Sequence, residues 1–472
     1  MTKSLQLGHR VRSQLILIGA CLFLWTLTAL ANSTAPETRV DSGILSGLEE
    51  EGVQAYRGIP YAAPPLGSLR WRAPQPPAPW SGARLARKFS PACAQRSYSR
   101  LPYTAEYRIP GPTSEDCLTL NIWTPALRDQ ERLPVLLWIH GGSFRTGSSS
   151  VPILDGRALA AHGIVVVTLN YRLGVLGFLA HPELTAESQL KTSGNYGLLD
   201  IIAALEWLKR NLPGFGGDPE RITLGGQSAG AFATQLLESA PAARGLFHQA
   251  IIQSGSMGRA VHWPSLSEGE AQGVRYLKSQ HQSSIETLRR VPVARLYAGS
   301  APDQRFPPIA DGVMILSEAS GFSVAPFDDV ATLTGLTADE THRYSPLMSA
   351  SARLEGSRAA RATLTQWALD RAEKTEAPLY LYLYDHISPG PESARWGAFH
   401  ASELPYVFEI LDAGRERPFT VQDREISRDL ADYWVNFIKT GNPNVARLPE
   451  WRAFSAAAPA VMEIGDRYQE RR

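Results

Sequence analysis

A serine flanked by two glycines stands in the segment Gly226-Gln227-Ser228-Ala229-Gly230. A short apolar run precedes this G-x-S-x-G pattern, and a helical pattern follows it. A serine on a sharp turn between a strand and a helix can act as a nucleophile, because the backbone N–H groups at the start of the helix lie beside it. Such a turn requires flanking glycines. The pattern predicts that Ser228 is a nucleophile for acyl transfer. The competing interpretation is a structural serine in a glycine-rich turn.

A second glycine-rich turn, His140-Gly141-Gly142-Ser143-Phe144, directly follows the apolar run 135–139. Attack of a serine on an ester carbonyl creates an oxyanion, which needs preorganised hydrogen-bond donors. Bare backbone N–H groups in such a turn supply them, together with the residue after the nucleophile. We therefore expect the N–H groups of Gly142, Ser143 and Ala229 to form an oxyanion hole.

The elements that must position these residues follow from the hydrophobic pattern. Continuous apolar runs are typical of strands that are covered on both faces of a sheet. Here they alternate with amphipathic helical patterns, including 198–208 and 430–438, which predicts an α/β fold with a mostly parallel central sheet and helices on both faces. The N-terminal part is richer in proline and aromatic residues and predicts short β-hairpins and ordered loops. The predicted strands are 135–140, 164–170, 222–225, 250–253, 331–335 and 379–384.

Composition excludes several classes of partner. The 472 residues are 44% hydrophobic and include 47 basic and 46 acidic side chains, so the net charge gives no reason to expect a nucleic-acid partner. No internal repeat or linker divides the chain, which predicts a single large domain. No histidine or cysteine cluster has the spacing of metal ligands, and we expect no metal or organic cofactor.

The N-terminus predicts export. Basic residues precede an uncharged stretch, 13–36, whose apolar centre leads to Ala29-Leu30-Ala31. This order is typical of a secretory signal peptide over 1–31, with 32–472 as the mature, secreted or periplasmic domain and no stable membrane association after cleavage. The alternatives are an uncleaved membrane anchor and a lipoprotein signal ending at Cys21.

Two cysteines, Cys93 and Cys117, remain if the signal peptide is removed. An isolated pair in an exported protein is a candidate disulfide. Two buried free thiols are the alternative.

Several further motifs resemble the type-B carboxylesterases, the family of para-nitrobenzyl esterases, animal carboxylesterases and cholinesterases. The resemblance covers nearly the whole mature chain, and it implies an α/β-hydrolase that cleaves a small-molecule carboxylic ester. The segments that carry it are Gly58–Tyr61 with Pro64-Pro65, Glu115–Leu118 with Leu120-Asn121, Asn170–Gly174, Gly194–Asp200, Gly214–Pro219, Gln253–Gly255 and Thr440–Asn444.

The resemblance also implies the other members of a catalytic triad. His400 lies in a segment, 397–406, that is similar to the family's histidine loop, and Glu340 stands at the position of the family's acid. Asp339 is the neighbouring alternative, and Thr341 replaces a glycine that the family usually has after the acid. The pair Cys93–Cys117 resembles the family's first loop disulfide.

The expected substrates are small neutral or aromatic esters with short acyl chains. The loop 94–116 lacks the tryptophan that binds the ammonium group in cholinesterases, and Gln227 stands where those enzymes have a carboxylate. The segment between Glu340 and His400 is also short. The alternatives are a non-catalytic adhesion module of the same fold, or an amidase, lactonase or thioesterase with the same triad.

Overall fold

The structure is a computed structural model that describes residues 35–96, 101–128, 130–255, 263–298, 304–316, 330–341 and 349–471. The predicted signal peptide and its cleavage site lie outside the described residues. Contacts group the residues from Glu37 onward into one unit. None of the helices in the described part of the chain combines the length and apolarity needed to span a bilayer.

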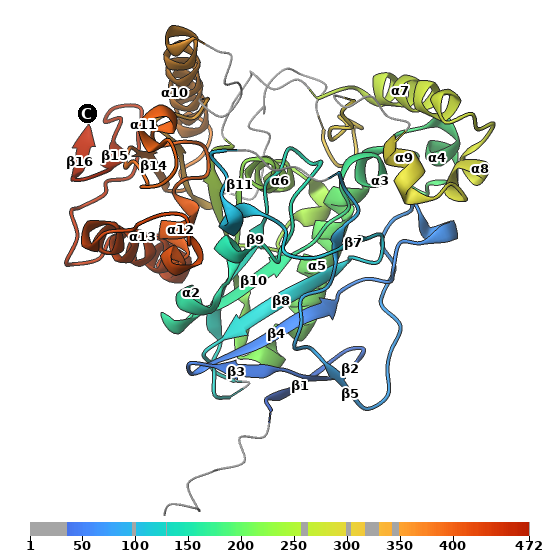
Figure 1. The fold of residues 1–472 in the computed structure, drawn as a ribbon, viewed down its shortest axis with the longest axis horizontal. Coiled ribbons are helices and arrows are strands. Elements are labelled where there is room, and N and C mark those ends of the chain that lie inside the picture. The colour runs from blue at the N-terminus through green and yellow to red at the C-terminus, as the bar shows by residue number, and fades with distance from the viewer. Residues whose placement is uncertain are drawn as a thin grey trace, which may run out of the picture. The chain divides into compact units, whose positions relative to one another are not determined.

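An eleven-stranded sheet runs through this unit (Figure 1). Its central strands are parallel, and antiparallel strands complete both edges. In spatial order the strands are β16 (Tyr468–Arg471), β15 (Val461–Ile464), β14 (Leu379–Tyr384), β13 (Ala331–Thr337), β12 (Gln249–Gln253), β11 (Gly217–Gln227), β9 (Leu133–Ile139), β10 (Val165–Leu169), β8 (Thr119–Thr124), β4 (Val53–Pro60) and β3 (Leu48–Glu50).

Helices follow the strands and cover the sheet. They are α2 (Arg157–Ala161), α3 (Gly174–Phe178), α4 (Pro182–Glu187), α5 (Tyr196–Asn211), α6 (Ala229–Glu238), α7 (Leu266–Ser279), α8 (Ile285–Arg289), α9 (Val293–Ala298), α10 (Ala350–Ala372), α11 (Ser393–Trp396), α12 (Leu404–Val407) and α13 (Val421–Thr440).

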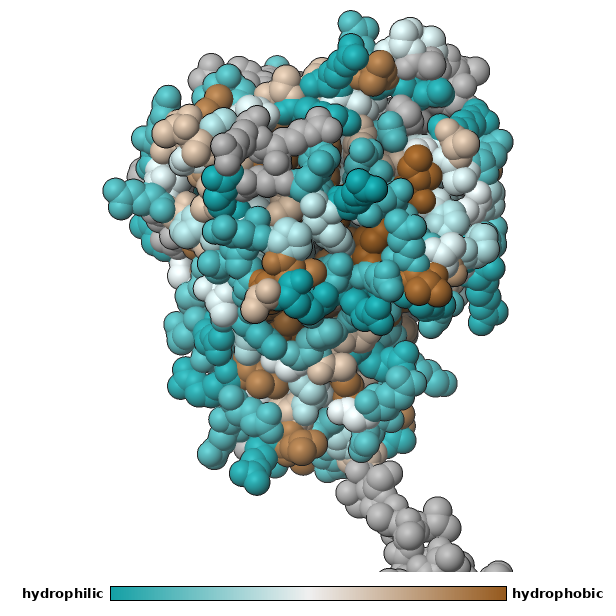
Figure 2. Space-filling view, turned by 90° about the vertical axis from the view of Figure 1, so that its left-hand side faces the viewer, coloured by the Kyte–Doolittle hydropathy of each residue, from teal (hydrophilic) through white to brown (hydrophobic). Residues whose placement is uncertain are grey.

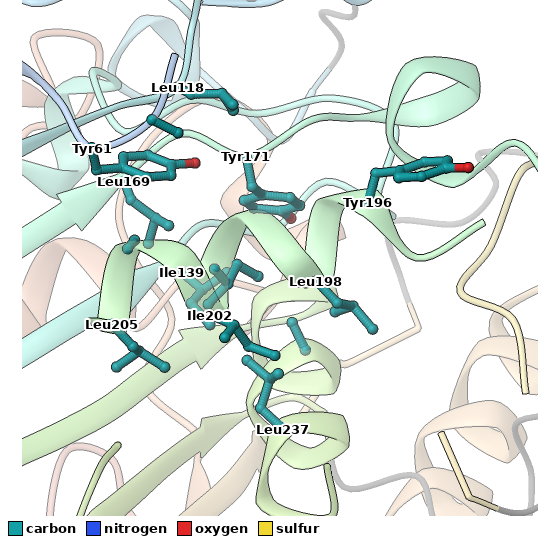
Figure 3. Packing of buried hydrophobic residues seen from close by; sticks show 14 of the residues in the cluster. Tyr61, Leu118, Ile139, Leu169, Tyr171, Tyr196, Leu198, Ile202, Leu205 and Leu237 are labelled. Carbon is teal, nitrogen blue, oxygen red and sulfur yellow. The ribbon is translucent and has the colours of Figure 1, made fainter. Parts of the chain in front are cut away.

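Alternating side chains of β9 show why the sheet needs helices on both faces. Val135, Leu137 and Ile139 belong to one hydrophobic cluster, which includes residues of α5 and α6. Leu136 and Trp138 belong to a second cluster, which includes residues of α12 and α13. Because successive side chains of a strand point to opposite faces, a continuous apolar run requires a core on each side. Figure 3 shows the first cluster, where helix and strand side chains meet.

The predicted fold class is confirmed, and each predicted strand is present. The largest difference is β11, which begins at Gly217 rather than at 222, because an irregular pairing with β9 extends it. The helix predicted over 198–208 spans Tyr196–Asn211, and the last helix ends at Gly441, whose φ of 76° provides a left-handed cap.

The N-terminal hairpins are present, but only one of them forms a separate sheet. The strands β1 (Glu37–Val40) and β2 (Gly43–Ser46) pair antiparallel, and β5 (Ala83–Leu85) joins β2. The hairpin of β3 and β4 instead continues the large sheet. On the face shown in Figure 2 the surface is mostly hydrophilic, and its hydrophobic residues lie in small separate groups.

Candidate active site

Ser228 occupies the turn between β11 and α6, with φ 58° and ψ −120°. The flanking glycines permit this turn. A Cβ at Gly226 would lie 2.4 Å from the carbonyl carbon of Gly230, and a Cβ at Gly230 would lie 2.0 Å from the carbonyl oxygen of Ile139. The Ser228 N–H donates a hydrogen bond of 2.8 Å to the carbonyl of Gln253 at the end of β12. The turn is thereby fixed to the neighbouring strand.

The turn after β9 brings Gly142 and Ser143 to the same cavity as Ser228. The φ angles are 115° at Gly142 and 57° at Ser143. A Cβ at Gly142 would lie 2.0 Å from the carbonyl oxygen of Thr146, so only glycine fits there. Within the described residues, the N–H groups of Gly142, Ser143 and Ala229 donate no hydrogen bond. The structure therefore leaves three backbone donors beside the serine.

A buried neutral histidine, His140, contacts this glycine turn. Burial lowers the pKa of His140 to about 4, so its ring carries no charge near neutral pH. Its Nδ1–H donates to the carbonyl of Gly141 at 2.8 Å, and its ring stacks on Tyr171 with centroids 4.6 Å apart. The Tyr171 hydroxyl donates back to the His140 carbonyl at 3.0 Å. These contacts fix the glycine turn, and the imidazole ring that makes them is uncharged near neutral pH.

Glu340 and His400 form a hydrogen-bonded pair, through Glu340 Oε1 and His400 Nδ1. Both side chains are almost fully buried, with 1% and 2% of their residue surfaces exposed. The second carboxylate oxygen, Oε2, accepts hydrogen bonds from the hydroxyls of Ser254 and Thr337, each at 3.0 Å, and from the Thr337 N–H at 3.1 Å. Because both oxygens have partners, the Glu340 carboxylate is fixed in orientation.

Asp339, the alternative acid, has a different role. Its carboxylate accepts a hydrogen bond of 2.9 Å from the N–H of Ala398, two residues before His400, and so fixes the histidine loop. Thr341, which replaces the expected glycine, points toward α10 and donates to the carbonyl of Arg353 at 2.9 Å. The substitution therefore leaves the Glu340–His400 pair intact.

Gln227 makes a contact that the sequence did not predict. Its side-chain amide donates to His400 Nε2 at 2.9 Å. With Nδ1–H directed to Glu340 and Nε2 accepting from Gln227, the His400 ring is in the neutral Nδ1–H tautomer. No motif marks this contact, because it depends on the side-chain rotamer of the residue before the serine.

A second buried carboxyl, Glu403, lies on the histidine loop three residues after His400. Burial, followed by the nearby Glu340 charge, raises its pKa to about 7, and a hydrogen bond from Gln253 opposes the shift. That hydrogen bond, from Gln253 Nε2 to Glu403 Oε1, measures 2.9 Å. The sequence pattern gave no sign that Glu403 would be enclosed, because the enclosing residues come from distant segments.

The predicted disulfide between Cys93 and Cys117 is confirmed, with a sequence separation of 24 residues. The loop that it closes is hydrogen-bonded to the histidine loop. The hydroxyl of Tyr103 donates to the carbonyl of His400 at 3.2 Å, and that of Tyr107 donates to the carbonyl of Ala401 at 3.1 Å. Tyr103 and Tyr107 thus connect the disulfide loop to the histidine loop, and both residues also line the cavity.

The cavity above Ser228 and His400 measures about 1110 Å³. Trp138, Ile153 and Leu404 contribute apolar wall, and no residue in the described part of α10 contributes to it. Within the described ranges, no group of three or more histidine, cysteine, aspartate or glutamate side chains is arranged to hold a metal ion. The site is a large pocket in which Ser228 and His400 lie together among apolar and polar lining residues.

Comparison with known proteins gives a consistent set of relatives. The model of the carboxylesterase family matches residues 34–364 and 359–472. Fumonisin B1 esterase of Sphingopyxis macrogoltabida is 35% identical over 92% of this chain and 89% of its own length. Para-nitrobenzyl esterase of Bacillus subtilis is 34% identical over 87% of this chain and 91% of its own. A crystal structure of a Geobacillus stearothermophilus carboxylesterase superposes with a TM-score of 0.78 at 31% identity, covering 92% of this chain and 97% of the other.

Proposed function

Since this chain belongs to the carboxylesterase family and is a carboxylic ester hydrolase, we propose that Ser228, His400 and Glu340 form its catalytic triad. The observation that carries the proposal is the buried Glu340–His400 pair, which lies in one site with a serine on a strained strand-to-helix turn. A nucleophile, a base and a group that orients the base are the three parts that acyl transfer requires.

In the proposed reaction, His400 Nε2 takes the hydroxyl proton of Ser228 while Oγ attacks the ester carbonyl. Glu340 holds Nδ1–H and stabilises the imidazolium that forms. His400 then gives the proton to the leaving alcohol, which departs and leaves an acyl-enzyme on Ser228. Water deprotonated by His400 attacks this acyl group, releases the carboxylic acid and restores the serine.

The negative charge of each tetrahedral intermediate would be stabilised by the N–H groups of Gly142, Ser143 and Ala229. These donors are fixed by the turn and by the start of α6, so no reorganisation is needed when the charge develops. The neutral His140 ring supports the same turn.

Gln227 sets a condition on this mechanism. Its amide donates to the same nitrogen that must accept the serine proton, so the contact must give way when substrate binds. Catalytic hydrogen bonds are often long or misaligned in ligand-free enzymes and tighten only with substrate present. We propose that an ester in the cavity displaces the Gln227 amide from Nε2.

Small neutral or aromatic esters with short acyl chains fit this site as substrates. The described cavity wall contains no carboxylate that would attract choline, and α10 does not narrow it. The same triad also serves amides, lactones and thioesters, so these analogues belong in the substrate screen.

The decisive test compares Ser228→Ala with Ser239→Ala on para-nitrophenyl acetate. Ser239 is a matched control, because it caps the other end of α6 and its hydroxyl donates to the carbonyl of Leu236 at 2.9 Å. We expect Ser228→Ala to lose on the order of 10⁶ in rate, with Ser239→Ala near wild type. A serine-reactive phosphonate should label wild type and Ser239→Ala and spare Ser228→Ala. Equal rates in the purified Ser228→Ala protein would reject the triad.

We also propose that the protein is exported after cleavage between Ala31 and Asn32. A disulfide in the domain supports this, because such bonds persist mainly in oxidising compartments. Intact-mass measurement of the protein recovered from its native host would show a start at Asn32, whereas a retained N-terminal segment would reject cleavage.

A further inference from the structure

Among the described residues, the wall of the active-site cavity carries charge of one sign only. Four arginines line it: Arg96, Arg108, Arg145 and Arg305. No aspartate or glutamate is among the described residues that line it. The whole chain balances 47 basic against 46 acidic residues, so this local excess does not follow from composition.

The arginines reach the cavity from three separate segments. Arg96 and Arg108 lie on the disulfide loop, Arg145 on the glycine turn that carries Gly142, and Arg305 beside Phe306. Segments distant in the sequence thus place the same charge around one opening. The Arg108 and Arg305 side chains are exposed to solvent, where they meet an arriving ligand first.

The described residues at the floor of the cavity add no opposing charge. Gln227 contributes a neutral amide beside Ser228. Glu340 does not line the cavity, because it lies behind His400 with 1% of its surface exposed. A cleft lined by one sign of charge concentrates the field and attracts ligands of the opposite sign.

We propose that the site prefers esters that carry an additional carboxylate, placed several bonds from the scissile carbonyl. This deepens the proposed function and rests on it. Guanidinium groups bind carboxylates through paired N–H···O bonds, and those of the exposed Arg108 and Arg305 would hold the anionic group while the neutral ester enters toward Ser228. Arg96 donates to the carbonyl of Tyr297 and contributes its charge. Within the proposed function, small neutral esters remain substrates, and an added carboxylate raises kcat/KM further.

Two matched substrate pairs test the proposal and locate the carboxylate. The first pair, 4-acetoxybenzoate and 4-acetoxybenzamide, differs in charge on the alcohol half. The second pair, monoethyl adipate and ethyl adipamate, differs in charge on the acyl half. Each kcat/KM is divided by the rate of the same ester with hydroxide, which removes differences in intrinsic reactivity. We expect at least one pair to show a preference of about 10-fold for the anion at low salt, which shrinks severalfold at about 0.5 M NaCl.

Arginine variants assign the preference to the cavity. Arg108→Gln and Arg305→Gln should each reduce the anion-to-neutral ratio about threefold, with little change for the neutral ester. Arg108→Lys keeps the charge and should retain most of the ratio. Arg290→Gln is the control, because Arg290 is exposed on the surface and pairs with Glu286 rather than lining the cavity.

The outcomes separate this inference from the proposed function. Ratios near one in both pairs, with neutral esters hydrolysed in a Ser228-dependent manner, would overturn the inference and leave the triad standing. A ratio that Arg108→Gln and Arg305→Gln leave unchanged, together with insensitivity to salt, would also overturn it. Failure to hydrolyse any ester would instead reject the proposed function.

Discussion

Replacing Glu403 by glutamine should stabilise the protein at alkaline pH and have little effect at acid pH. The side chain is fully buried, and within the described part of the chain the one side chain that donates a hydrogen bond to it is Gln253, at 2.9 Å. Glutamine has nearly the same shape and offers a carbonyl oxygen to the same donor. It stays neutral at every pH, whereas the Glu403 carboxyl must ionise inside the protein when the pH rises.

The size of the effect follows from the shift in pKa. Burial, with the Glu340 charge, raises the pKa of Glu403 from 4.5 to about 7. Below 4.5 both the folded and unfolded chains hold the proton. Between 4.5 and 7 only the unfolded chain releases it, which lowers the free energy of unfolding. Above 7 both are ionised, and the loss amounts to about 3 kcal/mol.

Equilibrium unfolding by guanidinium chloride, with the disulfide intact, measures this effect. The quantity of interest is the free energy of unfolding of Glu403→Gln minus that of wild type, at a series of pH values. Titration of all other groups largely cancels in this difference. We expect it to rise by about 3 kcal/mol between pH 4.5 and pH 8. A difference that stays constant over this range would refute the assignment of a raised pKa to Glu403.

Three further substitutions test other parts of the structure. Replacing Cys93 and Cys117 together by alanine should lower the free energy of unfolding by about 3 kcal/mol, since the bridge closes a 24-residue separation; reduction of wild type should have the same effect, and an unchanged value would contradict the bridge. Arg172→Lys should lower the free energy of unfolding in guanidinium chloride by about 3 kcal/mol, because lysine cannot reproduce the two buried hydrogen bonds to Asp200, at 2.7 and 2.8 Å. A loss below about 1 kcal/mol would show that this paired contact is dispensable. Thr337→Val removes a hydroxyl donor to the proposed triad acid and should lower kcat about 10-fold with little change in KM; a change confined to KM would exclude this positioning role.

The sequence was most informative where the backbone itself restricts the choice of residue. Gly226 and Gly230 could be interpreted because a side chain at either position would collide with backbone in a tight turn. The buried strands were predictable because β9 must be apolar toward both helix layers. Such constraints are local, so a single sequence reveals them.

Features that depend on packing between distant segments were not predictable. Asp339 and Glu340 are adjacent carboxylates after one strand, and the residues alone did not distinguish between them. The family resemblance indicated Glu340, and the way the chain leaves β13 directs Glu340 to His400 and Asp339 to Ala398. The contact of Gln227 with His400 depends on a rotamer. The convergence of arginines from three loops leaves no periodic signal at all, because the spacing of those residues along the chain is irrelevant to their meeting.

Hydrogen bonds between adjacent strand ends restrict which parts of this enzyme can change during evolution. Ser228 donates its N–H to the carbonyl of Gln253, and Ser254 donates its N–H to the carbonyl of Gly335, so the proposed nucleophile is fixed to three adjacent parallel strands. Residues proposed to bind the substrate, such as Arg108, belong instead to connecting loops. Selection can therefore alter exposed positions of those loops while the strand ends keep their register, provided that the Tyr103 and Tyr107 contacts to the histidine loop remain. Libraries that vary exposed positions of the disulfide loop, such as Arg108, and keep Tyr103, Tyr107 and the strand ends should yield folded enzymes with altered substrate ranges.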